Sequence, residues 1–174
     1  AALLSRVSGI TLRDAPSQTD LQALGIPAER MWLTADPAFL VHPADRLPGA
    51  GLPSGLKDSP AVFGVSLRTW PSLERSLPAL VRVCREFSER SGTSACFVPF
   101  QLPHDVEISR SAAEQSGAPQ AVMGARLSPA ESVRLFGEFR IVMGMRLHSL
   151  ILSAMSAVPF VGLSYDPKVE RFCA

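Results

Sequence analysis

Residues 140–157 read RIVMGMRLHSLILSAMSA, and this stretch decides the fold. An apolar run of strand length, 140–144, ends in Gly144 and is followed by a segment of helix length, 147–157. The pattern predicts a strand-to-helix turn of an α/β domain. Gly144 permits a tight turn with close backbone approach, and the start of the helix presents unpaired N–H groups and a positive dipole end. Such a turn is suited to an anionic ligand.

The alternation of strand and helix repeats from residue 61 onwards. Apolar runs predict strands at 61–67, 95–100, 121–123, 140–144 and 159–163. Helices are predicted at 73–87, 105–115 and 147–157, and a further one where Ser128-Pro129-Ala130-Glu131 forms a capping box. Five strands separated by helices indicate an α/β fold with a Rossmann-like, doubly wound parallel sheet and helices on both faces.

The chain before residue 61 is organised differently. Short elements are expected first: a strand at 10–12, a helix opened by Asp14 and an extended piece at 31–34. Residues 43–60 contain four prolines and three glycines without apolar periodicity, which is typical of a linker or surface loop. We therefore expect the tail of a first domain over 1–42, a linker over 43–60 and a C-terminal domain over 61–174. Because the chain starts without methionine, we expect a fragment of a longer protein.

Composition and charge exclude several classes of protein. The chain is 47% hydrophobic and 19% charged, and no apolar run approaches the roughly 18 residues of a membrane span, so we expect a folded domain without a transmembrane segment. The 17 basic residues nearly balance the 16 acidic ones, which gives no support to a nucleic-acid partner. Cys84, Cys96 and Cys173 lack metal-site spacing and are interpreted as reduced thiols of a cytoplasmic protein. Motifs of nicotinamide, P-loop, hydrolase and zinc enzymes are absent.

In such folds ligands collect at the carboxyl ends of the strands. Arg146 and His148 follow the fourth predicted strand: the arginine offers a planar donor fork for a carboxylate or phosphate, and the histidine can donate or accept a proton. Arg68 follows the first strand and Lys168 the fifth. Structural alternatives stay open. If these residues have structural roles instead of binding a ligand, Arg146 caps a neighbouring helix C-terminus and His148 is hydrogen-bonded under the sheet edge. Arg68 would be a surface arginine lying on Trp70.

Two acidic residues at these strand ends have a simple structural explanation. Asp105 is expected to be an acidic cap at the start of a helix. Asp166 is expected to cap another helix, whose first residue is Pro167.

Six short segments together resemble the polysaccharide pyruvyl transferase family, in particular its bacterial cell-wall (CsaB-like) branch. They occur in the family's order over nearly the whole chain: Thr11-Leu12-Arg13-Asp14, Thr34-Ala35-Asp36-Pro37-Ala38-Phe39, Gly64-Val65-Ser66-Leu67-Arg68, Val98-Pro99-Phe100-Gln101, Gly144-Met145-Arg146-Leu147-His148 and Ser164-Tyr165-Asp166-Pro167-Lys168. The resemblance implies two Rossmann-like domains facing across a cleft, as in GT-B glycosyltransferases. This chain would hold the C-terminal domain and the tail of the first.

The resemblance also implies a reaction. Members transfer the pyruvyl group of phosphoenolpyruvate to a sugar of a wall polysaccharide precursor, N-acetylmannosamine in the bacterial branch, as a cyclic ketal with release of phosphate. The partners implied are phosphoenolpyruvate and that precursor, with neither cofactor nor metal. A lipid-linked precursor would bring the protein to the inner face of the membrane.

Residue roles carry over from the family's Arg-Leu-His motif, which contributes to the phosphoenolpyruvate site. The resemblance thus implies this role for Arg146, Leu147 and His148, with Arg68 or Lys168 as a second cationic clamp. His148 is then a candidate general acid or phosphate ligand.

The base for the sugar hydroxyl stays open between Asp105 and Asp166. Two other functions also remain: a GT-B glycosyltransferase that uses a nucleotide sugar, and a non-catalytic domain that binds anions or sugars. We expect Arg146→Ala and His148→Ala to abolish activity with little change in melting temperature. The isolated chain is expected to turn over poorly, because the acceptor half of the cleft should lie upstream.

Overall fold

The chain divides into two compact units, Ala1–Leu40 and Val41–Ala174. The computed structural model describes residues 3–41, 51–71 and 73–174. Residues 43–50 of the predicted linker therefore lie outside the described residues.

The first unit is a small β-α-β arrangement. Its elements are η1 (Leu4–Arg6), β1 (Ile10–Leu12), α1 (Ala15–Ala23), η2 (Ala28–Arg30), β2 (Met31–Leu33) and η3 (Pro37–Leu40), with β1 and β2 paired in parallel. Asp14 caps α1 as predicted, because its carboxylate accepts a hydrogen bond of 2.9 Å from the Ser17 amide. Arg13 donates to Asp36 at 2.7 Å, so the segments that follow the two strands are joined by an ion pair.

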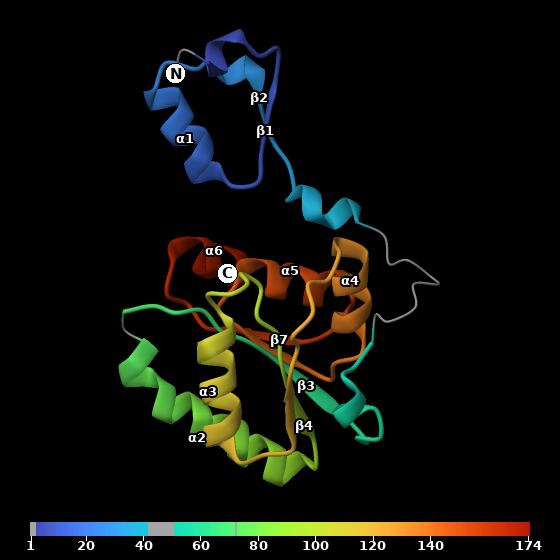
Figure 1. The fold of residues 1–174 in the computed structure, drawn as a ribbon. Helices are drawn as coiled ribbons and strands as arrows, with labels where there is room; N and C mark the ends of the chain where they lie inside the picture. The colour runs from blue at the N-terminus through green and yellow to red at the C-terminus, as the bar shows by residue number, and fades with distance from the viewer. Residues whose placement is uncertain (1–2, 42–50, 72) are drawn as a thin grey trace. The chain divides into compact units, whose positions relative to one another are not determined.

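The second unit contains a five-stranded parallel sheet with helices on both faces, which confirms the predicted fold class (Figure 1). Its elements are η4 (Ser54–Leu56), β3 (Val62–Ser66), α2 (Leu73–Ser91), β4 (Ser94–Phe97), α3 (Val106–Ser116), β5 (Gln120–Val122), α4 (Pro129–Gly137), β6 (Val142–Gly144), α5 (Leu147–Met155), β7 (Phe160–Gly162) and α6 (Pro167–Cys173). The strand order is β5-β4-β3-β6-β7, and every neighbouring pair is parallel. Each predicted strand and helix of this unit is present, displaced only at its ends.

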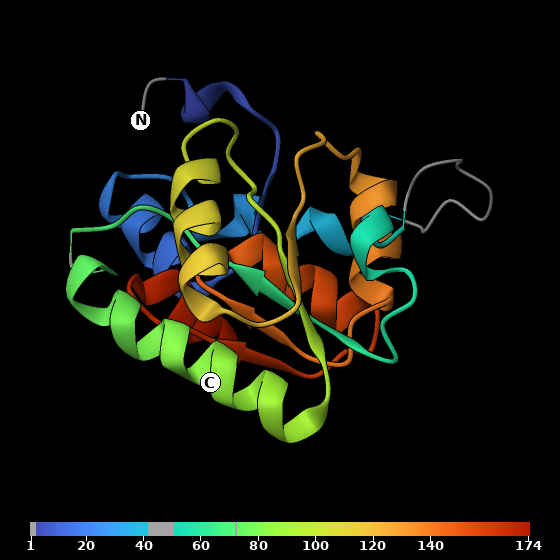
Figure 2. The same cartoon turned by 60° about the horizontal axis from the view of Figure 1, so that its bottom comes forward.

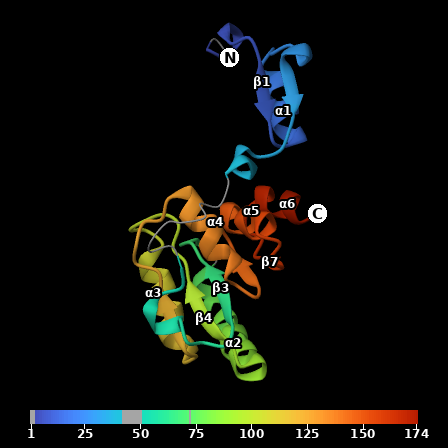
Figure 3. The ribbon, with the colours of Figure 1, turned by 90° about the vertical axis from the view of Figure 1, so that its right-hand side faces the viewer.

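Alternating residues of the central strand build two cores, one on each face of the sheet. Phe63 and Val65 pack on the face covered by α2 and α3, whereas Val62 packs on the face covered by α4, α5 and η4. This period of two is what a strand buried on both faces requires. Figure 3 shows the two groups of helices on opposite sides of β3 and β4, and Figure 2 shows the long α2 helix across one face.

Part of the predicted linker belongs to the second of these cores. The short helix η4 lies within the predicted linker. It buries Leu56, which is 1% exposed, in the same hydrophobic cluster as Val62 and Val98. One buried leucine among prolines and glycines produces no apolar periodicity. For this reason the sequence pattern indicated only a loop.

Gly144, at the end of β6, allows α5 to pack directly against the strand. An added Cβ would meet the Ser149 hydroxyl and would lie 2.8 Å from Leu150 Cδ2. The φ angle of Gly144 is not positive, so its backbone needs no special conformational freedom. A glycine was expected here for a tight turn and for close approach of the backbone, and the close approach is confirmed. The missing side chain lets the first turn of α5 lie against the sheet edge.

Ala157 offers a test of local strain. It has a φ of 54° in the turn after α5, a left-handed conformation that costs a non-glycine residue roughly 1 to 2 kcal/mol. We expect Ala157→Gly to raise the free energy of unfolding by up to about 1 kcal/mol, because the relieved strain exceeds the added entropy of the unfolded chain. Urea unfolding measures the change. Ala154→Gly, an exposed position within α5, should lower the same free energy by up to about 1 kcal/mol. Stabilisation by both variants would contradict the assignment of strain to Ala157.

Candidate functional site

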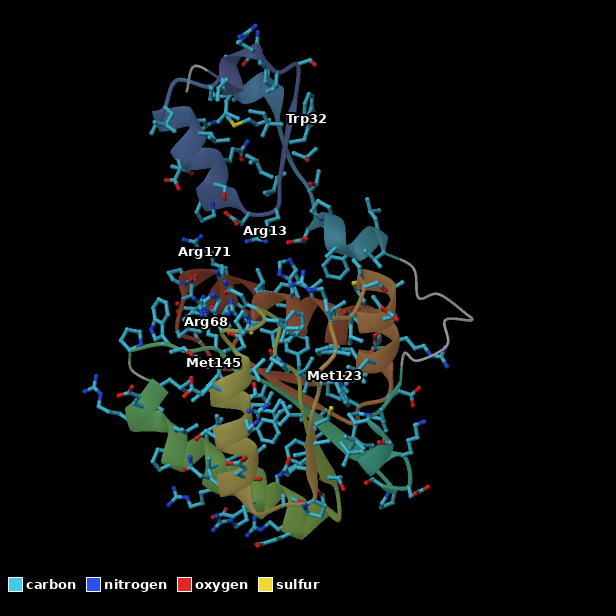
Figure 4. All side chains as sticks on the ribbon, in the orientation of Figure 1. Arg13, Trp32, Arg68, Met123, Met145 and Arg171 are labelled. Carbon is cyan, nitrogen blue, oxygen red and sulfur yellow. The ribbon has the colours of Figure 1, made fainter. Side chains whose placement is uncertain are left out.

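The strand order places a topological switch point between β3 and β6. From β3 the chain builds outward through β4 to β5, and it then returns to add β6 and β7 on the other side. The loops that leave the carboxyl ends of β3 and β6 therefore diverge, and such a crevice is where open α/β sheets bind ligands. A hydrogen bond of 2.8 Å from the Met145 amide to the carbonyl of Ser66, the last residue of β3, joins the two strand ends. Figure 4 labels Arg68 and Met145, one from each loop.

Arg146 extends from the β6–α5 loop across β3 to the loop that follows β4. Its Nε donates to Asp105 Oδ2 at 3.0 Å and its Nη2 to Asp105 Oδ1 at 2.5 Å. This bidentate pair is largely buried, with side-chain exposures of 18% for Arg146 and 1% for Asp105. The structural alternative in which Arg146 caps a helix C-terminus is therefore wrong: its partner is a buried carboxylate at the start of α3.

Asp105 shapes the loop between β4 and α3. Its Oδ2 accepts hydrogen bonds from the amides of Gln101 at 2.8 Å and Phe100 at 3.2 Å, in addition to the two from Arg146. It precedes α3 but makes no capping bond to that helix, so the expected cap is wrong. A buried carboxylate that accepts four hydrogen bonds is poorly suited to take a proton from a sugar hydroxyl.

Arg68 extends in the opposite direction, across β6 to the loop that follows β7. Its Nη1 donates to the Tyr165 hydroxyl at 2.9 Å, and its guanidinium carbon lies 5.1 Å from the ring centroids of both Trp70 and Tyr165. The predicted cation–π contact with Trp70 is confirmed, although Arg68 is half-buried rather than on the open surface. Two buried polar atoms here, Arg68 Nε and Ser66 Oγ, have no hydrogen-bond partner in the described part of the chain.

The remaining residues of the Arg-Leu-His motif have unlike environments. Leu147 is 6% exposed, so its side chain belongs to the interior. His148 is exposed on the first turn of α5. The structural alternative of a histidine buried under the sheet edge is therefore wrong, and the imidazole is accessible to a substrate.

Lys168 and Asp166 lie together at the start of α6. Asp166 caps the helix as predicted, accepting a hydrogen bond of 3.0 Å from the Lys168 amide, and its Oδ2 lies 3.3 Å from Lys168 Nζ. That amide, together with the nearby charges of Lys168 and Arg68, holds the pKa of the Asp166 carboxyl below its ordinary value. Asp166 thus stays ionised and pairs with Lys168, whereas Asp105 pairs with Arg146. Arg68 is held by the two aromatic rings and the Tyr165 hydroxyl, with the charge of Asp166 nearby.

A cavity of about 380 Å³ lies one strand further along the sheet edge, between the loops that follow β4 and β5. Phe100, Gln101, Met123, Arg126 and Ser132 are among its lining residues. Met123 is labelled in Figure 4, to the right of Arg68 and Met145. Gln101 also accepts a hydrogen bond of 3.0 Å from Arg146 Nη2, so the cavity adjoins the Arg146–Asp105 pair.

Two contributors to this arrangement were missed by sequence reasoning. Gln101 and Tyr165 lie in segments that match the family, yet no local pattern marks either as a partner of an arginine.

Within residues 3–41, 51–71 and 73–174, no three His, Cys, Asp or Glu side chains gather as a metal site would require. No helix in these ranges is long and apolar enough to cross a membrane.

Comparisons with known proteins give a family and a fold. A family model described as Polysaccharide pyruvyl transferase matches residues 1–167. The UDP-GlcNAc 2-epimerase of Methanocaldococcus jannaschii, solved with UDP-GlcNAc and UDP, superimposes with a TM-score of 0.66 at 11% identity, covering 95% of this chain and 48% of the epimerase. A Listeria monocytogenes protein assigned as a UDP-N-acetylglucosamine 2-epimerase superimposes with a TM-score of 0.60 at 15% identity. That match covers 89% of this chain and 42% of the Listeria protein. The chain thus spans about half the length of either structure, and the likeness shows the fold alone. No protein of curated function matches the sequence.

The burial of Asp105 changes what we expect of Arg146→Ala. The sequence alone predicted little change in melting temperature. From the structure we expect the free energy of unfolding to fall by roughly 3 kcal/mol, because the variant leaves a buried carboxylate without its cation. The double variant Arg146→Ala/Asp105→Asn should recover part of this loss, because it removes the unpaired charge. Thermal and urea unfolding of the three proteins measure both effects. Arg82→Ala, which breaks an exposed pair with Glu86, is the matched control and should stay near wild type. An equally stable Arg146→Ala would contradict a structural role for the pair.

Proposed function

This chain belongs to the polysaccharide pyruvyl transferase family, and on that premise we propose that the full-length protein transfers a pyruvyl group from phosphoenolpyruvate to a cell-wall polysaccharide precursor. The acceptor is N-acetylmannosamine, and the product is a cyclic ketal. The observation that carries the proposal is the pair of arginines at the switch point, Arg68 and Arg146, beside the first turn of α5. Phosphoenolpyruvate has a carboxylate and a phosphate, and the two loops at the switch point offer one cation for each of its anionic ends.

The reaction balances without a further reactant. Two sugar hydroxyls bond to C2 of phosphoenolpyruvate, and the C2–oxygen bond to phosphate breaks. One hydroxyl hydrogen is transferred to the methylene carbon, which becomes the ketal methyl group, and the other leaves as a proton with phosphate. The protein must therefore supply a proton donor at the methylene carbon and stabilise the departing phosphate. Cationic side chains and helix N–H groups serve the second purpose.

His148 is the residue that we propose as general acid. It is exposed on the first turn of α5, two residues after Arg146, so an imidazole that can donate or accept a proton stands beside the proposed anion site. Of the two carboxylates considered as base for the acceptor hydroxyl, Asp105 is unsuited, because its side chain is 1% exposed and already holds Arg146. Asp166 is 27% exposed, but it follows β7, on the side of β3 away from the cavity between the β4 and β5 loops, and its lowered pKa disfavours retention of a proton. We therefore assign neither carboxylate as that base.

The reaction is proposed to take place in the cytoplasm, where phosphoenolpyruvate is made, and at the inner face of the membrane if the acceptor is lipid-linked. Cys84, Cys96 and Cys173 are free thiols, which fits a reducing compartment.

Calorimetric titration distinguishes this function from its main competitor. The two epimerase structures share the fold, and a nucleotide sugar would also use cations at a switch point. We expect phosphoenolpyruvate to bind the full-length protein with a dissociation constant in the micromolar to millimolar range, and UDP-sugars to give no heat. Tight UDP-sugar binding without a response to phosphoenolpyruvate would contradict the proposed function and favour an enzyme of nucleotide sugars, such as a glycosyltransferase. Silence from both would favour a non-catalytic domain.

Replacement of His148 tests the general acid. We expect His148→Ala to lower kcat at least roughly 100-fold, because a positioned proton donor contributes about that much or more. The melting temperature should stay near wild type, since the side chain is exposed. His104→Ala removes another exposed histidine, in the β4–α3 loop, and is the matched control. Phosphate release measured with phosphoenolpyruvate and acceptor reports kcat. Full activity of His148→Ala would rule out this role.

A further inference from the structure

The guanidinium of Arg146 has one edge held by the protein and one edge that a ligand can use. Of its five N–H groups, that of Nε and one of Nη2 bind the Asp105 carboxylate. The second N–H of Nη2 binds Gln101 Oε1 at 3.0 Å. The two N–H groups of Nη1 have no partner in the part of the chain that the structure describes. The outer edge formed by Nη1 and Nη2 is therefore half occupied, and Gln101 is the occupant.

A bidentate anion must displace Gln101 to bind Arg146. A carboxylate or phosphate engages two parallel N–H groups of a guanidinium, and the edge formed by Nε and Nη2 is taken by Asp105. Asp105 does not yield, because it is buried and charged and would lose its cation. Gln101 is neutral and its side chain is exposed, and its single bond to Arg146 is replaced by bonds to a charged acceptor, which are stronger.

We propose that Gln101 is a positioning residue that couples the donor site to the acceptor site. The incoming carboxylate or phosphate takes the place of the Gln101 amide on Arg146. The released amide then turns into the adjoining cavity, where it binds hydroxyl groups of the acceptor sugar, so this chain supplies one side of an acceptor site whose other side is expected upstream. The identity of the anion as phosphoenolpyruvate rests on the proposed function. The coupling itself rests on Gln101 being both a partner of Arg146 and a wall of the cavity.

The cavity has the chemistry that a sugar ring requires. Its volume of about 380 Å³ lies within the range of small-molecule pockets. Phe100 and Met123 supply apolar surface, while Arg126 and Ser132 supply donors on the side away from Arg146. The released Gln101 amide adds a donor and an acceptor on the near side. The acceptor therefore gains this contact only after the donor is bound, which predicts ordered binding with phosphoenolpyruvate first.

Two substitutions at residue 101 separate this proposal from a merely structural role. Gln101→Ala removes the competitor for Arg146, and we expect phosphoenolpyruvate to bind roughly threefold more tightly, the scale of one net hydrogen bond. Its KM for the acceptor should rise roughly fivefold, with kcat little changed. Gln101→Glu places a carboxylate on the same edge, so phosphoenolpyruvate should bind at least roughly tenfold more weakly. Both variants keep the backbone amide that donates to Asp105.

Calorimetry with phosphoenolpyruvate and steady-state kinetics with the acceptor, both on the full-length protein, provide the readouts. Gln115→Ala changes an exposed glutamine at the far end of α3 and should match wild type. Opposite shifts of phosphoenolpyruvate affinity for Gln101→Ala and Gln101→Glu support the proposal. Unchanged or weaker binding by Gln101→Ala, or an unchanged acceptor KM, overturns it while leaving the proposed function standing. Absence of phosphoenolpyruvate binding by the wild-type protein overturns both.

Discussion

The ion pair between Arg146 and Asp105 is the interaction on which the arrangement of the site depends. It joins residues 41 positions apart in sequence, on loops whose strands are separated by β3 in the sheet. Neither partner is stable in this environment without the other, because a buried carboxylate without its cation costs several kcal/mol. The same carboxylate binds the Phe100 and Gln101 amides and so sets the loop before α3. The direction of Arg146 and the position of Gln101 both follow from one buried charge.

The two arginines at the switch point are held by different means, and this divides their roles. Arg146 crosses β3 and is fixed by a carboxylate that also neutralises it. Arg68 crosses β6 and is fixed by two aromatic rings and the Tyr165 hydroxyl, and no carboxylate of the described residues lies at ion-pair distance from it. In the proposed function, Arg146 orients the anion and Arg68 attracts it. An anion with two charged ends is suited to such a pair, because one end is oriented while the other is neutralised.

For Arg146, a structural role and a ligand-binding role are not alternatives. A guanidinium has more than one hydrogen-bonding edge, and the fold uses only the edge formed by Nε and Nη2. The loss of stability expected on removing this side chain therefore carries no information against a role in binding. His148 differs, because its exposed side chain contributes little to packing. For such a residue, loss of activity without loss of stability is informative.

The sequence by itself determined the fold class, the order of the strands and helices along the chain, and the position of Arg68, Arg146, His148 and Lys168 after strands. These features follow from apolar periodicity and helix-start signals, which act over a few residues. Only the tertiary structure decided that β3 neighbours β6, that Asp105 holds Arg146 rather than capping α3, and that Gln101 and Tyr165 contact the arginines. Those contacts join residues that are distant in the chain and meet only when the sheet is assembled. The physical reason is that burial and strand order, rather than local pattern, select the partner of each charge.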